Sequence, residues 1–156
     1  MISIEPTPEA LAAEVLDTMP LVMYYIRSYV RRETKSSSSI PQVRVLAFIK
    51  RRPGSSLSEL AEALGVTKAT ASTLVERMVQ KRLVKRTEDP KERRCIVLTL
   101  TKEGEVHLAE VRDLAIGEVA RILKDLPAQK LRKIHEGMAL LHEVFGVTGN
   151  GMHKEE

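Results

Sequence analysis

Apolar residues along this 156-residue chain recur mostly at intervals of three and four positions, the period of an α-helix. The first such run follows Thr7-Pro8, which suits an N-cap with proline at the first helical position, and it continues to Val30. Pro20 interrupts the run and should kink this helix or split it in two. The segment KSSSSIP, residues 35–41, then predicts a polar loop.

A second helix is expected over PQVRVLAFIKRR, and the turn residues Pro53-Gly54 should end it. Its apolar positions are Val43, Leu46, Ala47 and Ile49.

Two short helices are predicted next. Ser56 and Glu59 form a capping box ahead of LAEAL, and Gly65 is a suitable helix stop. Thr67 should cap the following helix, KATASTLVERMVQKR, whose apolar face is Ala71, Leu74, Val75 and Met78. This pattern is typical of a helix-turn-helix, although many helical hairpins also carry a glycine in the turn, so the stretch alone leaves both interpretations open.

The apolar period then changes from helix to strand. RLVKRTE and CIVLTLT flank a turn at Asp89-Pro90, and in the second run Ile96, Leu98 and Leu100 alternate with other residues as in a half-buried strand. These runs predict a β-hairpin, and residues 86–94 place four basic and three acidic side chains on it. Such charges are often simply solvated, but a charged hairpin directly after a basic helix-turn-helix favours the wing of a winged helix that reaches the minor groove of DNA.

Two long helices are expected at the C-terminal end. Thr101 should cap the first, Pro127 should break it, and the last helix carries a heptad-like apolar seam at Leu131, Ile134, Met138, Leu141 and Phe145. The predicted fold is mainly α with a small β-hairpin wing. We expect the winged helix-turn-helix to span residues 38–101. The helical dimerisation region would consist of residues 1–37 and 102–146, and a flexible tail would follow over residues 147–156. The terminal helices could pack within one monomer, but two-fold palindromic DNA favours a homodimer.

Composition narrows the class of protein. Hydrophobic residues make up 43% of the chain, aromatic residues 3%, and Trp is absent, so we expect an aliphatic core. The net charge is +4, but the window from Lys50 to Arg94 holds 12 basic and 6 acidic residues, which suggests a module that binds a polyanion. One cysteine excludes a disulfide within the chain, and we see neither signal-peptide features nor an apolar run of membrane-spanning length. We therefore expect a soluble, cytoplasmic protein.

The stretch LSELAEALGVTKATASTLVERMVQKRLVKRTEDPKERRCIVLTLTKEGE resembles the core of the MarR (multiple antibiotic resistance regulator) family of winged-helix transcription factors. Its most specific parts are LVKR, DPKERR and LTLTKEG, and the resemblance extends over roughly residues 8–146. Two positions depart from the family pattern. The wing carries Glu92-Arg93-Arg94 instead of Asp-x-Arg, and Arg82 replaces a glycine. The resemblance implies a triangular homodimer that acts as a regulator, usually a repressor. In that family a small phenolic or other ligand, or in some branches oxidation or a metal, releases the operator.

Candidate DNA-binding residues lie on the second short helix and on the wing. The positive end of the helix dipole and the hydroxyl groups in the first turns of this helix can bind phosphate, and Arg77 can bind guanine. Helix capping by the hydroxyl groups and a surface ion pair of the arginine would also explain these residues. Arg94 is the first choice for the minor groove. The helix candidates are Lys68, Thr70, Ser72, Thr73 and Arg77, and the wing candidates are Lys91, Arg93 and Arg94. Arg86 with Glu92 or Asp89 should orient the wing.

Other chemistry is weakly indicated. Tyr24, Tyr25 and Arg27 could line an effector pocket for a small phenolic or amphipathic molecule, or simply pack at an interface. Cys95 suits a partly buried strand thiol better than a redox sensor. Three histidines (His107, His135, His142) lack the i, i+4 spacing of helical zinc ligands, so we expect no metal and no cofactor.

No nucleophile–base pair or phosphate loop suggests an enzyme, although an unrecognised active site is one alternative. A helical protein–protein adaptor with a degenerate helix-turn-helix is another. Because an adaptor has no use for Arg77, Arg93 and Arg94 on one surface, we favour double-stranded DNA as the partner.

Overall fold

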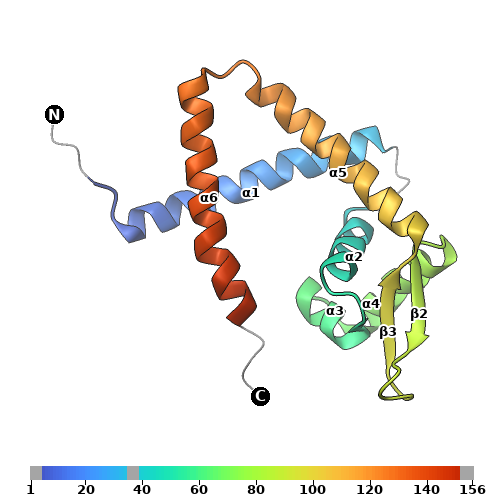
Figure 1. The fold of residues 1–156 in the computed structure, drawn as a ribbon. Helices are drawn as coiled ribbons and strands as arrows, with labels where there is room; N and C mark the ends of the chain where they lie inside the picture. Colours follow the sequence, from blue (N-terminus) through green and yellow to red (C-terminus); the bar gives the residue numbers. More distant parts are fainter. Residues whose placement is uncertain (1–4, 35–38, 152–156) are drawn as a thin grey trace. The chain divides into compact units, whose positions relative to one another are not determined.

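A computed structural model describes residues 5–34 and 39–151 of the chain. The chain divides into two compact units, Met1–Glu118 and Val119–Glu156. The elements, in chain order, are α1 (Pro8–Glu33), α2 (Ile40–Arg51), β1 (Ser55–Ser56), α3 (Leu57–Leu64), α4 (Lys68–Gln80), β2 (Val84–Glu88), β3 (Ile96–Leu100), α5 (Lys102–Leu123) and α6 (Ala128–Gly151) (Figure 1). The mainly helical fold with a β-hairpin that the sequence predicted is therefore confirmed.

The predicted helix caps form hydrogen bonds at four helix starts. Each cap side chain accepts a backbone N–H three residues further on, and the four residues are Thr7, Ser56, Thr67 and Thr101. The capping box of α3 is complete, because Ser56 N–H also donates to Glu59 Oε2 at 2.7 Å. These caps satisfy N–H groups that have no partner inside the helix, so each helix begins at a residue that its local sequence specifies.

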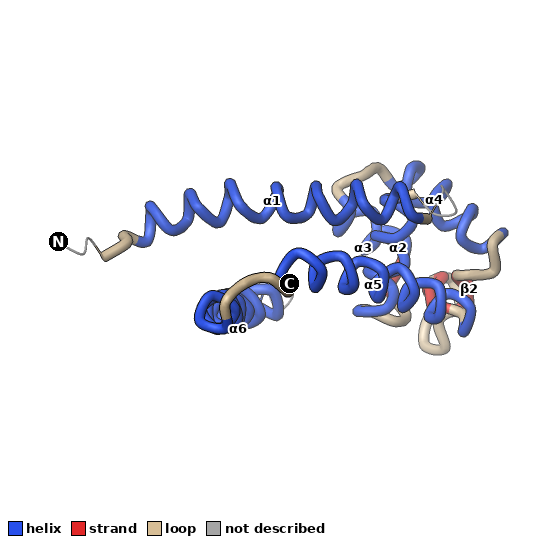
Figure 2. Tube along the Cα trace, turned by 90° about the horizontal axis from the view of Figure 1, so that it is seen from above, coloured by secondary structure: helices blue, strands red, loops and turns tan. Residues whose placement is uncertain are grey.

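Two details of the N-terminal part differ from the expectations. Helix α1 runs through Pro20 as one helix, so of the two outcomes expected at this proline, a kink or a split, the split is wrong (Figure 2). Helix α2 already begins at Ile40, inside the stretch that was expected to be loop up to residue 41. The rest of that loop, residues 35–38, lies outside the described residues.

The core of the first unit is mostly aliphatic. Ten buried side chains form one cluster: Val45, Leu46, Phe48, Ile49, Leu60, Val75, Met78, Leu83, Val84 and Leu98. On α2, burial of Leu46 and Ile49 was predicted correctly, but Val45 and Phe48 are buried in place of Val43 and Ala47. Helix α2 contacts α3, α4 and β3, so it buries a wider arc than a helix with a single packed face.

A three-stranded antiparallel sheet, in the order β1-β3-β2, joins the hairpin to the helices. In the predicted hairpin, Val84 pairs with Leu100 and Glu88 with Ile96. Leu98 faces the core at 1% exposure, whereas Ile96, near the tip, is 54% exposed. Strand β1 was not predicted, because its two residues are too short to show a period of two.

Helix α4 ends in a tight turn that places an arginine in the left-handed region. Leu83 N–H donates to Met78 O and Arg82 N–H donates to Val79 O, both at 2.9 Å, which is the Schellman pattern of paired hydrogen bonds. Arg82 has a φ of +59° at the position that usually favours glycine. Among the described residues it is the one non-glycine residue with positive φ, so the turn holds local backbone strain.

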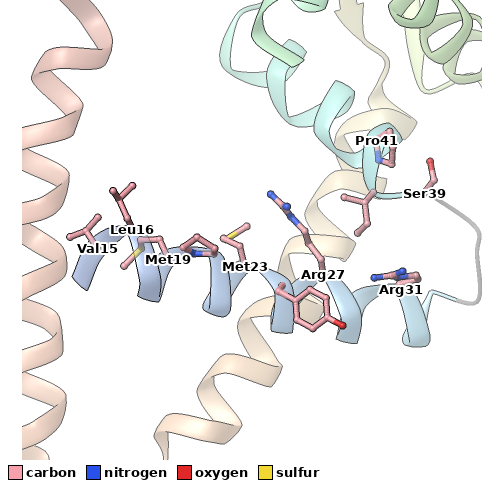
Figure 3. Close-up of a pocket in the computed structure, with 11 residues that line it drawn as sticks. Val15, Leu16, Met19, Met23, Arg27, Arg31, Ser39 and Pro41 are labelled. Carbon is pink, nitrogen blue, oxygen red and sulfur yellow. The ribbon is translucent and has the colours of Figure 1, made fainter. Parts of the chain in front are cut away.

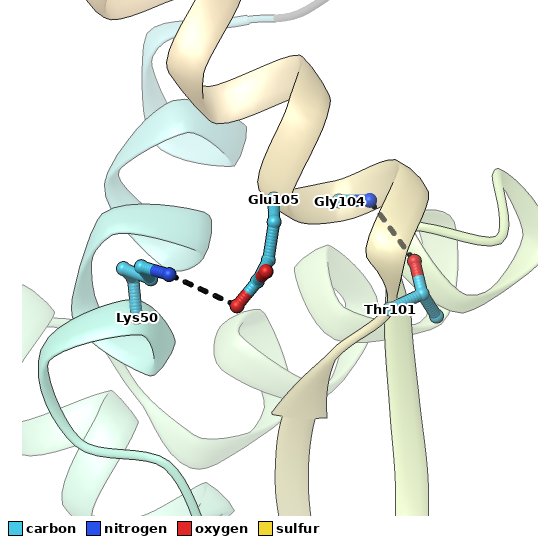
Figure 4. Close-up of polar contacts among 4 residues, drawn as sticks. All are labelled: Lys50, Thr101, Gly104 and Glu105. Atoms are coloured by element: carbon cyan, nitrogen blue, oxygen red, sulfur yellow. Dashed lines mark hydrogen bonds and ion pairs between the residues drawn. The ribbon is translucent and has the colours of Figure 1, made fainter.

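The start of α5 is bound closely to this same turn. Thr101 N–H donates to Leu83 O at 3.1 Å, and Thr101 Oγ1 donates to Arg82 O at 2.6 Å. Figure 4 shows two further contacts, Gly104 N–H to Thr101 Oγ1 at 3.0 Å and Lys50 Nζ to Glu105 Oε1 at 2.9 Å. Helix α5 is therefore joined to both the hairpin and α2.

A buried glutamine connects two helices of the helix-turn-helix region. Gln42 is only 6% exposed, and its Oε1 accepts Ser39 N–H at 3.3 Å and Lys81 Nζ at 3.2 Å. Ser39 is the N-cap of α2 and Lys81 is the C-cap of α4. One side-chain oxygen thus contacts the beginning of α2 and the end of α4.

Helix α6 continues to Gly151, so residues 147–151, which were expected to begin the tail, are helical. Up to Gly146, where side chains are described, none of its residues is buried. Its exposed large apolar side chains are Leu131, Ile134, Met138, Leu140, Val144 and Phe145. In the described part of the chain, no helix combines the length and apolar character needed to cross a membrane.

Candidate nucleic-acid interface

Helices α3 and α4 are joined by the tight turn that a helix-turn-helix requires. Gly65 adopts a φ of +66°, and Val66 N–H donates back to Ala61 O at 3.0 Å, which ends α3 sharply. The inner face of α4 is then fixed in the core, because Ala71, Val75 and Met78 are fully buried. The opposite face of α4 is consequently held at the surface in a defined orientation.

This outer face carries the predicted contact residues. Ser72, Thr73 and Arg77 line one shallow depression of about 560 Å³, together with Glu76 and Gln80, which were not among the predicted residues. Lys68 and Thr70 are exposed in the first turn of the helix. The Thr73 hydroxyl donates to Ala69 O at 3.2 Å. The surface therefore presents hydroxyl, guanidinium and amide groups side by side. Proteins that recognise base edges in the major groove of DNA use the same groups.

The hairpin tip, residues 89–95, is closed by its own hydrogen bonds. Asp89 Oδ1 accepts Lys91 N–H, Asp89 N–H donates to Cys95 O, and Cys95 N–H donates to Glu92 O, each at 2.8 Å. Lys91, Arg93 and Arg94 are all exposed. Both carboxylates of the tip are engaged in local hydrogen bonds, whereas the three cationic side chains point into solvent where a polyanion could approach.

The expected partner of Arg86 was wrong. Arg86 Nη1 lies 3.4 Å from Glu76 Oε2 of α4, and among the described residues it forms no ion pair with Asp89 or Glu92. Glu76 is on α4, which packs against β2, whereas the tip carboxylates are turned to the backbone and thiol of the tip. The ion pair therefore joins the hairpin to α4 instead of joining its two arms.

Cys95 is exposed at the tip, so the expectation of a partly buried strand thiol was also wrong. Its Sγ donates to Glu92 Oε2 at 3.2 Å. This hydrogen bond raises the pKa of the Cys95 thiol above its usual value, and the negative charges of Glu92 and Asp89 act in the same direction. Cys95 therefore stays protonated and poorly nucleophilic at neutral pH.

A second surface feature lies along α1. A groove of about 1090 Å³ is lined by one side of α1 and the first residues of α2, and Val15, Met23 and Arg27 project into it from the same side of α1 (Figure 3). Tyr24 and Arg27, two of the three residues suggested for an effector pocket, line this groove. Tyr25 does not, because its hydroxyl donates to Glu118 of α5 at 2.5 Å. Within the described ranges, no three His, Cys, Asp or Glu residues are grouped closely enough to hold a metal ion.

The comparisons with known proteins agree with this geometry. The sequence model of the MarR family matches residues 38–94, which contain α2, α3, α4, β2 and the hairpin tip up to Arg94. Over these residues the chain is therefore similar to the MarR family. The match includes the depression on α4 and the charged tip, so the resemblance inferred from LVKR and DPKERR is confirmed.

Curated relatives and a solved structure extend the likeness to transcriptional regulators beyond that segment. The chain is 34% identical over 90 residues to the HTH-type transcriptional repressor MdtR of Bacillus subtilis, covering 58% of each chain. It is 41% identical over 69 residues to the transcriptional regulator HosA of Escherichia coli, covering 44% of this chain and 51% of HosA. The chain therefore spans little more than half the length of these relatives. The crystal structure of transcriptional regulator Tm0710 from Thermotoga maritima matches 92% of this chain and 99% of its own, with a TM-score of 0.69 and 25% identity.

Proposed function

We propose that this chain is a MarR family protein and a sequence-specific, DNA-binding transcriptional regulator. It acts as a homodimeric repressor that binds a near-palindromic operator and leaves it when a small-molecule effector binds. One observation carries the proposal: α4 exposes Arg77 on its outer face and packs against β2, and the hairpin that β2 begins exposes Arg93 and Arg94 at its tip. MdtR, with which the chain aligns over 90 residues, is a transcriptional repressor.

The two surfaces suit two grooves of one DNA half-site. An α-helix fits the major groove, where Arg77 can form a bidentate contact to guanine, and Lys68 and Thr70 at the first turn suit phosphate. Arg94 on the wing suits the neighbouring minor groove, whose negative potential is greatest where it is narrow. Lys91 and Arg93 are then backbone contacts that add affinity without sequence preference.

Exposed apolar side chains support the homodimer. Leu16 and Leu21 of α1 are 73% and 68% exposed, and on α6 Leu140 is 63% exposed. Apolar stripes of this kind lower the free energy when a second surface covers them. A two-fold dimer would also match a palindromic operator, with half-sites about one helical turn, ~10 bp, apart.

DNA binding is tested by selecting bound duplexes from a random library and titrating them by fluorescence anisotropy at several salt concentrations. Arg94→Ala should weaken binding by roughly 1–3 kcal/mol, most strongly for sites with A·T-rich flanks. Arg77→Ala should instead relax discrimination inside the half-sites. Arg112→Ala, which removes an exposed arginine of α5, is the matched control and should bind like the wild type. If Arg94→Ala binds the selected duplexes as tightly as the wild type at every salt concentration, the hairpin does not contact DNA as a wing. If no duplexes are selected, the protein does not bind DNA sequence-specifically.

Assembly is tested by light scattering at micromolar concentration. A dimer should report about twice the 17.5 kDa of the chain, and Leu141→Asp, in the half-buried position of the α6 seam, should weaken both dimer and DNA binding. A monomer that still binds its operator specifically contradicts this part of the proposal.

A further inference from the structure

The outer face of α4 carries a carboxylate within the proposed DNA contact. Six residues on one side of the helix line the depression there: Ala69, Ser72, Thr73, Glu76, Arg77 and Gln80. Glu76 is the one acidic residue among these six. We propose that Glu76 recognises a cytosine in each operator half-site, with its carboxylate accepting a hydrogen bond from the N4 amino group, and that Arg86 positions it. The inference rests on the proposed DNA binding and adds to it the base that this residue selects.

A carboxylate on a surface that faces phosphate groups needs a compensating contact, because like charges repel. Arg86 Nη1 lies 3.4 Å from Glu76 Oε2, so the guanidinium supplies part of that compensation. The side chain of Glu76 nevertheless stays 52% exposed. In the part of the chain that the structure describes, no hydrogen bond or ion pair engages its second oxygen, Oε1. Glu76 therefore offers one partly neutralised acceptor to a donor that approaches α4.

The major-groove edges of the four bases decide which base suits this acceptor. Cytosine presents the N4 amino donor, whereas guanine presents the acceptors N7 and O6, and thymine presents the acceptor O4 beside its methyl group. A carboxylate attracts the first edge and repels the other two. Adenine places an N6 donor next to the acceptor N7, which suits an amide better because an amide both donates and accepts. Glutamate at position 76 therefore favours cytosine, and glutamine there would favour adenine.

The neighbouring Arg77 offers the opposite chemistry on the same surface. Its exposed guanidinium donates, and a guanine edge accepts through O6 and N7. Adjacent residues of a helix rise by about 1.5 Å and base pairs by about 3.4 Å, so Glu76 and Arg77 can reach the same or neighbouring base pairs. The pair of side chains therefore suits a cytosine and a guanine close together in each half-site.

Arg86 acts through Glu76 and not on the base itself. It lies in β2, where its backbone pairs with the buried Leu98 of β3, and α4 packs against β2. Because both backbones are held, the ion pair restricts the rotamers of Glu76 and reduces the entropy that this side chain loses when it binds a base. The guanidinium also weakens the repulsion between the carboxylate and nearby phosphates. Arg86 is therefore a positioning residue.

The test is selection of duplexes from a random library, followed by anisotropy titrations of duplexes that differ at one base pair per half-site. At the position assigned to Glu76, the wild type should bind the cytosine duplex at least about tenfold more tightly than the other three. Glu76→Gln should bind the adenine duplex best, and Glu76→Ala should bind all four within about threefold of one another. Glu110→Gln, which removes an exposed carboxylate of α5, is the matched control and should keep the preference for cytosine.

Variants of Arg86 test its positioning role. Arg86→Ala should reduce the preference for cytosine to about threefold, because the carboxylate loses both its orientation and its neutralising partner. Arg86→Lys keeps the positive charge and should restore most of the preference. A pair that only joins the hairpin to α4 would instead change the affinity for all duplexes by the same factor.

Two results would overturn the inference: a wild-type base preference at every position in Glu76→Ala and Glu76→Gln, or an equal loss of affinity for all duplexes in both variants. Circular dichroism of each variant separates lost binding from lost folding, and Glu76→Gln, which keeps the size of the side chain, decides if Glu76→Ala fails to fold. If the wild type selects no duplexes, the proposed function fails and this inference fails with it. If duplexes are selected but no position responds to Glu76, the inference alone fails.

Discussion

Replacing Gly104 with alanine tests how α5 is joined to the turn after α4. A Cβ at this position would lie 2.0 Å from Leu83 O and 3.0 Å from Leu83 C, and both are backbone atoms. No side-chain rotation can relieve such an overlap, so the start of α5 must move away from the turn. That movement lengthens the hydrogen bond from Thr101 N–H to Leu83 O, which is now 3.1 Å.

Three contributions set the magnitude of the Gly104→Ala effect. Overpacking costs roughly 1–3 kcal/mol, and the weakened Thr101 hydrogen bond costs about 1 kcal/mol. The better helix propensity of alanine offsets about 1 kcal/mol. The free energy of unfolding should therefore fall by about 1–3 kcal/mol, measured by urea unfolding with far-ultraviolet circular dichroism at a fixed protomer concentration.

Gly117→Ala on the same helix is the matched control. A Cβ there has nothing within 4 Å, so the substitution should raise stability by up to about 1 kcal/mol through helix propensity alone. The free energy of unfolding should therefore fall for Gly104→Ala and rise for Gly117→Ala. If Gly104→Ala is as stable as the wild type, α5 does not approach the turn as closely as the structure shows.

Three further predictions concern local chemistry. Arg82→Gly should raise the free energy of unfolding by roughly 1 kcal/mol, because φ is +59° at this residue, and a higher midpoint of thermal unfolding would be the sign. Ser56→Ala removes the N-cap of α3 and should lower the free energy of unfolding, measured in urea, by about 1 kcal/mol. Ser58→Ala, inside the same helix, should lower it much less, and equal decreases for the two variants would contradict the capping argument. Glu92→Gln should lower the raised pKa of Cys95, so that more thiolate is present at a given pH. Alkylation of Cys95 by iodoacetamide should then be faster than in the wild type when both proteins are folded, and equally fast when both are unfolded in urea. Equal rates in the folded proteins would show that Glu92 does not raise the pKa of the thiol.

Local features of this fold could be predicted from the sequence because neighbouring residues determine them. Ser56 and Thr67 cap helices through hydrogen bonds to residues three positions away, and Gly65 ends α3 through its own backbone freedom. The hairpin followed from alternation and a turn at Asp89-Pro90, because both strands belong to one continuous stretch.

Contacts between distant residues could not be predicted in the same way. Tyr25 reaches Glu118 across 93 positions, and Arg86 pairs with Glu76 of α4 because that helix packs against β2. Strand β1 exists because Ser55 lies beside Leu98 in the folded sheet, and its two residues carry no pattern of their own. On the candidate DNA surface, the outward residues of α4 followed from its apolar period. The hydrogen bonds that close the hairpin tip join residues only two and three positions apart, but no sequence period marks which side chains form them.

The shared oxygen of Gln42 has a consequence for folding. Because it accepts hydrogen bonds from both Ser39 and Lys81, the first turn of α2 cannot open without freeing a buried amide from the end of α4. Opening at either helix end loses the hydrogen bond from Lys81 to Gln42, which is worth about 1–3 kcal/mol because the donor is charged, so partial unfolding that detaches only one helix is disfavoured. The two helices should therefore exchange their amide hydrogens as one cooperative unit, and the residues of α4 that face outward are carried on a segment that opens only together with α2.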